Sequence, residues 1–144
     1  MKNVNLTISR DLYKINPREI KNKISRDNWV DSIEKEYNYF IWFENTEKGE
    51  KTLNEIEAIP ESFRDKTLKG LNKLKACAEY NEKKKYYELI VLFVEDFGLI
   101  SITNMRSIDF RQLQSLLNLA KHLDAYLLNN GTEIIDESYL ESLS

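Results

Sequence analysis

"YYELIVLFVEDFGLISITN", residues 86–104, is the stretch that decides the fold. Two runs rich in branched and aromatic residues, 86–94 and 98–104, predict strands. Between them, Glu95, Asp96 and Gly98 are good turn formers, so the stretch predicts a hairpin. Asp96-Phe97-Gly98 is also the magnesium-binding tripeptide of protein kinases, but the sequence lacks the glycine-rich and catalytic-loop motifs that kinases need. We therefore interpret the tripeptide as a turn.

The segments around this hairpin add both kinds of secondary structure. Residues 3–9 alternate Val4, Leu6 and Ile8 with polar neighbours, which is the period of a half-buried strand. Residues 37–45 carry aromatic and branched side chains on both faces and predict a central strand covered on both sides. Helix-start signals and apolar spacings of three or four residues predict helices over 16–24, 25–37, 60 to about 80, and 109–123.

Two segments are less regular. Residues 46–62 predict a loop with some short structure, and residues 124–135 fit either a helix end or a hairpin around Gly131. The strand-like residues after Gly131 favour the hairpin. Strands and helices are mixed without strict alternation, so the sequence predicts one α+β domain over residues 1–144. We expect a mostly antiparallel sheet of about five or six strands packed with three or four helices.

Composition places the protein in a broad class. The chain has 144 residues, 42% of them apolar and 31% charged, which suits one globular domain with a substantial core. The longest apolar run has the length of a strand, and the first residues do not have the pattern of a signal peptide. A cytoplasmic protein without a membrane segment is the expectation. The single Cys77 excludes an internal disulfide.

Residues that could carry catalysis are few. Cys77 and His122 each occur once, and Cys77 lies beside apolar residues where a cysteine packs as a small hydrophobe. One Cys and one His do not make a structural zinc site, and no calcium-loop or glycine-rich phosphate-loop pattern occurs in the sequence. We therefore predict no catalytic residue, no metal site and no cofactor, and the sequence favours a protein that is not an enzyme.

Two alternative functions stay open at this point. A metal-assisted hydrolase could use carboxylates such as Glu55, Glu57 and Asp96, provided that the fold brings them together. A nucleic-acid-binding or nucleotide-binding domain could use the basic helix predicted within 62–85, a segment with a net charge of +5. Because the whole chain has a net charge of −3, long-range attraction to nucleic acid is weakened, and this partner is not favoured.

The sequence favours a protein that binds another protein. Residues 44–61 have a net charge of −4, and such a block can attract a partner with a basic surface. Lys outnumbers Arg fifteen to six, as in many AT-rich bacterial and phage genes, and this bias concerns the source and not the mechanism. Since the sequence has no catalytic constellation, cofactor loop or metal-ligand set, the concrete hypothesis is a bacterial or phage inhibitor or immunity-type protein that blocks its partner. Trp42 is included as an interface anchor if it is exposed. The predicted partner-binding residues are Glu44, Glu47, Glu50, Glu55, Glu57 and Trp42.

Overall fold

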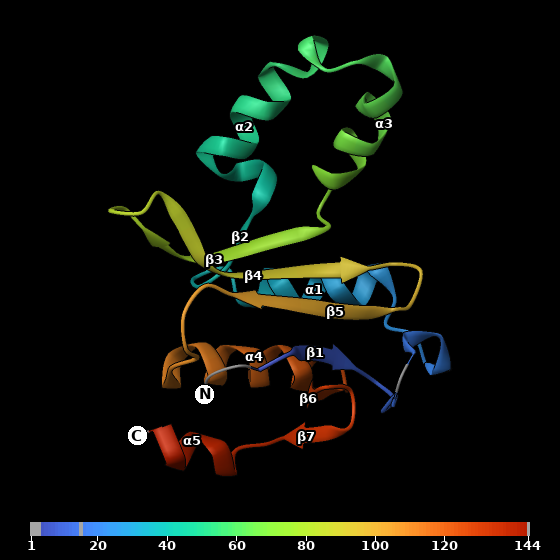
Figure 1. Ribbon diagram of the computed structural model, residues 1–144, viewed down its shortest axis with the longest axis vertical. Coiled ribbons are helices and arrows are strands. Elements are labelled where there is room, and N and C mark those ends of the chain that lie inside the picture. Colours follow the sequence, from blue (N-terminus) through green and yellow to red (C-terminus); the bar gives the residue numbers. More distant parts are fainter. Residues whose placement is uncertain (1–3, 15, 144) are drawn as a thin grey trace.

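The structure, a computed structural model, describes residues 4–14 and 16–143. Its centre is a seven-stranded, fully antiparallel sheet with the strand order β2-β3-β4-β5-β1-β6-β7 (Figure 1). The strands are β1 (Leu6–Ser9), β2 (Ile41–Trp42), β3 (Lys75–Asn81), β4 (Tyr86–Val94), β5 (Leu99–Asn104), β6 (Tyr126–Asn129) and β7 (Glu133–Ile135). This confirms the predicted α+β class, with a larger sheet than expected.

Two of the helices, α1 (Arg26–Lys35) and α4 (Phe110–His122), lie behind this sheet (Figure 1). The others are α2 (Glu47–Asn54), α3 (Glu61–Gly70) and α5 (Ser138–Leu143). Figure 1 shows α1 and α4 on one face of the sheet, and their buried side chains form the core with the strand residues that point toward them. Asp109 caps α4 through a hydrogen bond from the backbone N–H of Gln112, as the sequence predicted. None of the helices in the described residues has both the length and the apolar character needed to cross a lipid bilayer.

The segment between β1 and α1 closes one end of the sheet. The backbone N–H of Ile24 donates to the carbonyl of Gly98 at 2.9 Å, and the Tyr13 hydroxyl is 2.8 Å from Thr7 Oγ1. Gly98 has φ +64°, and a Cβ there would lie 2.3 Å from the Cβ of Lys23. A glycine is therefore required at this turn both for its backbone conformation and for the close approach of residue 23.

Several sequence predictions are confirmed. The pattern at 86–104 forms the β4–β5 hairpin, and 124–135 forms the β6–β7 hairpin. Leu6 and Ile8 of β1 are both buried. Asn3, the first residue of that predicted strand, and Ile15 lie outside the described residues.

Other predictions are wrong, and each has a local cause. The helix predicted over 60 to about 80 ends at Gly70, and residues 75–81 form β3, where Ala76 and Ala78 point into the core at the spacing of a strand. The helix predicted over 16–24 is a single 3-10 turn, η1 (Pro17–Glu19), although its capping box does form. Residues 37–45 contain only the two-residue strand β2, which lies at the edge of the sheet and not at its centre.

Candidate functional site

The feature that departs most from the rest of the fold is an extension between β2 and β3, residues 44–71, which we call the arm. It contains α2, the 3-10 turn η3 (Ile56–Ala58) and α3, so residues 46–62 have more helix than the loop with some short structure that was predicted there. In Figure 1 the arm projects beyond the β2–β3 edge of the sheet, with η3 at the tip farthest from the strands. Its two ends join neighbouring strands, so the arm is held only at its base.

The arm has almost no core of its own. No side chain of α3 is buried, and the one buried residue of α2 is Gly49; both helices lie entirely within the described residues. Large apolar side chains are exposed instead, with exposed fractions of 60% for Phe63, 45% for Leu53 and 40% for Leu68. Phe63 belongs to the helix predicted from apolar spacings of three or four residues, a pattern that predicts burial, and the structure leaves it uncovered.

Specific hydrogen bonds hold the arm at its base and near its tip. Thr46 caps α2, because its Oγ1 accepts a hydrogen bond from the Gly49 N–H at 3.0 Å. Glu44 Oε2 accepts from the backbone N–H of Lys73 at 2.6 Å and so links the start of the arm to the residues just after its end. On α3, the Arg64 guanidinium donates to the carbonyl of Ile59 at 3.1 Å. These bonds orient the helices without burying their apolar side chains.

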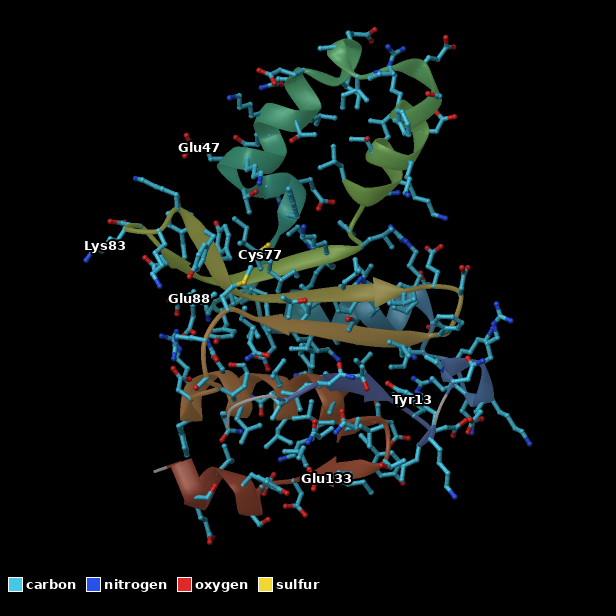
Figure 2. All side chains as sticks on the ribbon, in the orientation of Figure 1. Tyr13, Glu47, Cys77, Lys83, Glu88 and Glu133 are labelled. Carbon is cyan, nitrogen blue, oxygen red and sulfur yellow. The ribbon has the colours of Figure 1, made fainter. Side chains whose placement is uncertain are left out.

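The structure places the predicted partner-binding residues on two different surfaces. Glu47, Glu50, Glu55 and Glu57 are exposed along α2 and the tip, and Figure 2 shows Glu47 on the outer side of α2. Glu44 is half-buried at the base. Trp42 is 8% exposed and packs edge-on against Trp29, so it is a core residue and does not meet the condition of exposure on which its prediction depended.

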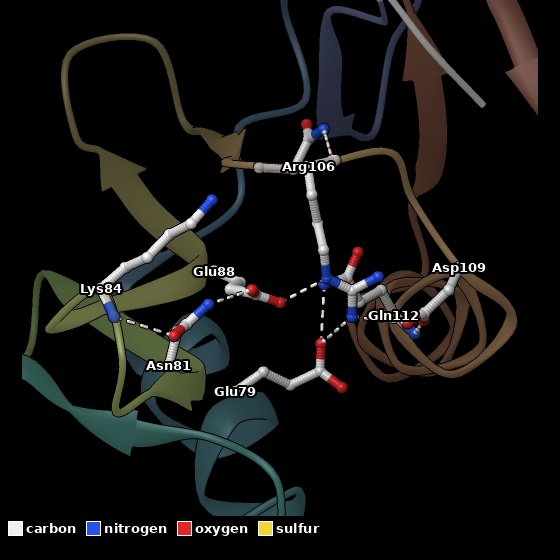
Figure 3. A network of polar contacts seen from close by, with 8 residues as sticks. Glu79, Asn81, Lys84, Glu88, Arg106, Asp109 and Gln112 are labelled. Carbon is white, nitrogen blue, oxygen red and sulfur yellow. Dashed lines mark hydrogen bonds and ion pairs between the residues drawn. The ribbon is translucent and has the colours of Figure 1, made fainter.

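A second polar cluster lies where the β3–β4 hairpin meets the beginning of α4 (Figure 3). Arg106 forms ion pairs with Glu88, with Glu79 at 3.1 Å and with Asp109 at 2.6 Å. The buried Gln112 adds a hydrogen bond from its Nε2 to Glu79 Oε2 at 2.7 Å. Sequence reasoning missed this cluster because its members are separated by up to 33 positions. Only the spacing of Arg106 and Asp109 around a helix start was visible.

Arg106 neutralises part of this acidic cluster and lowers two pKa values. Its hydrogen bond is the main reason why the pKa of Glu88 lies below its usual value. The pKa of Asp109 is also lowered: burial raises it, but the backbone N–H of Gln112 and the Arg106 side chain outweigh that effect. Because one guanidinium already contacts three carboxylates, the cluster ties β3 and β4 to α4 and is best explained as structural.

We expect Arg106→Gln to lower the free energy of unfolding at pH 7 by about 1–2 kcal/mol. This loss is smaller than the loss expected on breaking a fully buried ion pair, because Arg106 is partly exposed. Since the folded pKa values of Glu88 and Asp109 lie below the unfolded ones, the stabilisation is present above about pH 4 and is lost as the pH falls through the folded values. The difference between the wild type and the variant should therefore shrink in acid. Urea unfolding at a series of pH values measures it.

Arg18→Gln is the matched control, since Arg18 makes no side-chain ion pair in the described structure and sits in the exposed turn η1. Its pH profile should follow that of the wild type. A difference for Arg106→Gln that stays constant down to strong acid would contradict the assigned role of the ion pairs.

Cys77 and His122 do not form a catalytic pair. Cys77 is buried in β3, and burial raises the pKa of its thiol to about 11, so the nucleophilic thiolate is scarce at neutral pH. His122 is at the end of α4, where its Nε2 lies 3.3 Å from Glu36 Oε1. The two side chains therefore belong to different elements with different partners.

The carboxylates of the hydrolase hypothesis are not brought together. Glu55 and Glu57 are at the tip of the arm, whereas Asp96 is in the β4–β5 turn. Within the described residues, no group of three His, Cys, Asp or Glu side chains is arranged to hold a metal ion. The basic segment 62–85 is also divided between α3, β3 and the turn that follows, so it does not form the single basic helix on which the nucleic-acid hypothesis relied.

A groove of about 470 Å³ lies between α4, β6, β7 and α5. Its floor is mostly apolar, with Leu117, Leu127 and Ile135 among its lining residues. Lys121 and Glu137, at its rim, form an ion pair with each other. Because these charges neutralise each other, the groove presents few polar groups to orient a ligand, and the arm is the better candidate site.

Comparisons with protein-family models, with curated proteins and with solved structures find no match.

Proposed function

We propose that this protein acts by binding another protein, and that the arm is its docking surface. The observation that supports the proposal is the lack of a core in the arm: Leu53, Phe63 and Leu68 are exposed, and neither α2 nor α3 buries an apolar side chain. An inhibitor or immunity-type role, in which the arm covers a functional surface of the partner, is the specific form of this proposal.

The physical argument rests on the length of the helices. α2 and α3 have 8 and 10 residues, and isolated helices shorter than about 12–15 residues are marginal in water. Short helices in proteins are normally stabilised by burying an apolar face, which these two helices do not do within this chain. A partner that covers the arm supplies the missing burial.

The charge of the arm indicates the chemistry of that partner. Glu47 and Glu50 on α2 and Glu55 at the tip are exposed, and none of them forms an ion pair in the described part of the chain. A partner surface with an apolar centre and Lys or Arg at its rim complements this arrangement. Charge complementarity of this kind accelerates association and favours the correct partner.

Affinity capture with crosslinking from the native cell extract tests the proposal. We expect one stoichiometric partner with the wild-type protein. Its apparent affinity should fall by about tenfold or more for the double variant Glu47→Lys/Glu50→Lys and for Phe63→Ser, because the first reverses the rim charge and the second removes apolar contact area.

The matched control is Glu82→Lys/Asp96→Lys, which makes the same charge change at two exposed positions outside the arm. It should capture the partner as the wild type does. Equal capture by all variants would place the binding surface elsewhere, and no partner with any of them would remove the proposal.

A further inference from the structure

The distribution of charge along the arm is the starting point for one further inference. The tip, residues 55–61, carries Glu55, Glu57 and Glu61 and no basic residue. The end of α3 carries Lys66 and Lys69, and Lys73 and Lys75 follow directly after the arm, with no acidic residue in 66–75. Along the α3 side of the arm, the charge therefore changes from acidic at the tip to basic toward the base. The α2 side, where Glu47 and Glu50 alternate with Lys48 and Lys51, has no such gradient.

This arrangement is complementary to itself. If the α3 helices of two arms lie antiparallel about a two-fold axis, the acidic tip of each faces the basic end of α3 in the other, as an isologous interface requires. Four helices are then brought together, and Phe63, Leu53 and Leu68 of both copies are placed in the middle. Small helical bundles are stabilised by such a shared apolar centre.

We propose that, in the absence of its partner, the protein forms a symmetric dimer in which the arms of two copies cover each other. The inference rests on the proposed function, because both take the arm as the docking surface. A partner must then compete with the second copy, so the dimer is the resting form of the binding protein.

The charges that this interface needs are accessible. Lys66 and Glu61 are exposed, and neither forms an ion pair in the structure as described. Lys69 contacts Glu95 at 3.3 Å, but its side chain is 67% exposed and can reach a second acidic group. Because these charged side chains are already exposed, the dimer can form without a conformational change that exposes them.

Sedimentation equilibrium of the purified protein from about 1 µM to about 1 mM tests the inference with two charge-reversed variants. The tip variant is Glu55→Lys/Glu61→Lys, and the base variant is Lys66→Glu/Lys69→Glu. Each alone should dimerise at least about tenfold more weakly than the wild type, because like charges then meet at both ends of the interface. An equimolar mixture of the two should restore the dimer as a heterodimer, since every tip then meets a base of opposite charge.

Phe63→Ser should also weaken the dimer by about tenfold or more, whereas Tyr37→Ser, which removes an exposed aromatic ring outside the arm, should not. A wild-type protein that is monomeric throughout the range overturns the inference. A dimer that none of the arm variants weakens overturns it as well. Neither result affects the capture experiment in cell extract, which tests partner binding independently. A failure of the dimer inference can therefore be distinguished from a failure of the proposed function.

Discussion

Replacement of Trp29 by alanine should lower the free energy of unfolding by about 3–5 kcal/mol. Trp29 is 0% exposed in α1, and its ring stacks on Phe93 with centroids 5.9 Å apart. Its indole Nε1 also donates to the carbonyl of Lys73 at 2.8 Å, so the same side chain holds the segment that follows the arm. The variant loses apolar burial, leaves a cavity and removes this hydrogen bond. Urea unfolding followed by far-UV circular dichroism measures the loss.

Trp29→Phe separates these contributions if the alanine variant does not fold. It keeps a ring against Phe93 and loses the hydrogen bond to Lys73, so it should cost less than the alanine variant. Tyr37→Ala is the control, because Tyr37 is 74% exposed and its replacement should change stability by no more than about 0.5 kcal/mol. A Trp29→Ala protein as stable as this control would contradict the central place given to Trp29 in the core.

The parts of the fold that could be predicted are those with local signals. The β4–β5 hairpin has long apolar runs on both sides of a turn, and α4 has both a capping residue and a regular apolar stripe. By contrast, β3 was predicted as helix because Leu71, Leu74 and Ala78 have a helical spacing. The positive φ of Lys73 interrupts the helical backbone, and residues 75–81 form a strand because they pair with β4. Such pairing is a tertiary effect that local propensity does not contain.

The same distinction applies to the candidate site. The acidic character of residues 44–61 was visible in the sequence, and the exposed glutamates of α2 agree with it. The exposure of Phe63 was not visible, because an apolar stripe predicts burial whether or not the chain supplies something to cover it. Trp42 is the opposite case: its prediction as an interface residue required exposure, but its aromatic side chain packs against Trp29 in the core.

Gly49→Ala should be the most disruptive single-methyl change in the arm. A Cβ at Gly49 would lie 1.9 Å from the carbonyl oxygen of Phe43 and 2.8 Å from Glu44 Cα, both of which are backbone atoms that cannot move aside cheaply. α2 must therefore shift away from the 3-10 turn η2 (Phe43–Asn45), which also strains the cap between Thr46 and the Gly49 N–H. Overpacking and a weakened cap together predict a loss of about 2–4 kcal/mol.

Gly70→Ala provides a control with identical chemistry. It lies at the end of α3, and a Cβ there would have nothing within 4 Å, so alanine should be neutral or stabilise the arm by up to about 1 kcal/mol. Urea unfolding and limited proteolysis within 44–71 should separate the two variants, with faster cleavage only for Gly49→Ala. Because the arm has so little core, the contact of α2 with η2 is one of the few that fix its direction, and a docking surface must keep its direction to recognise a partner. Equal stability and equal cleavage of the two variants would show that α2 is not packed on η2, and the arm would then be a flexible tether without a fixed docking surface.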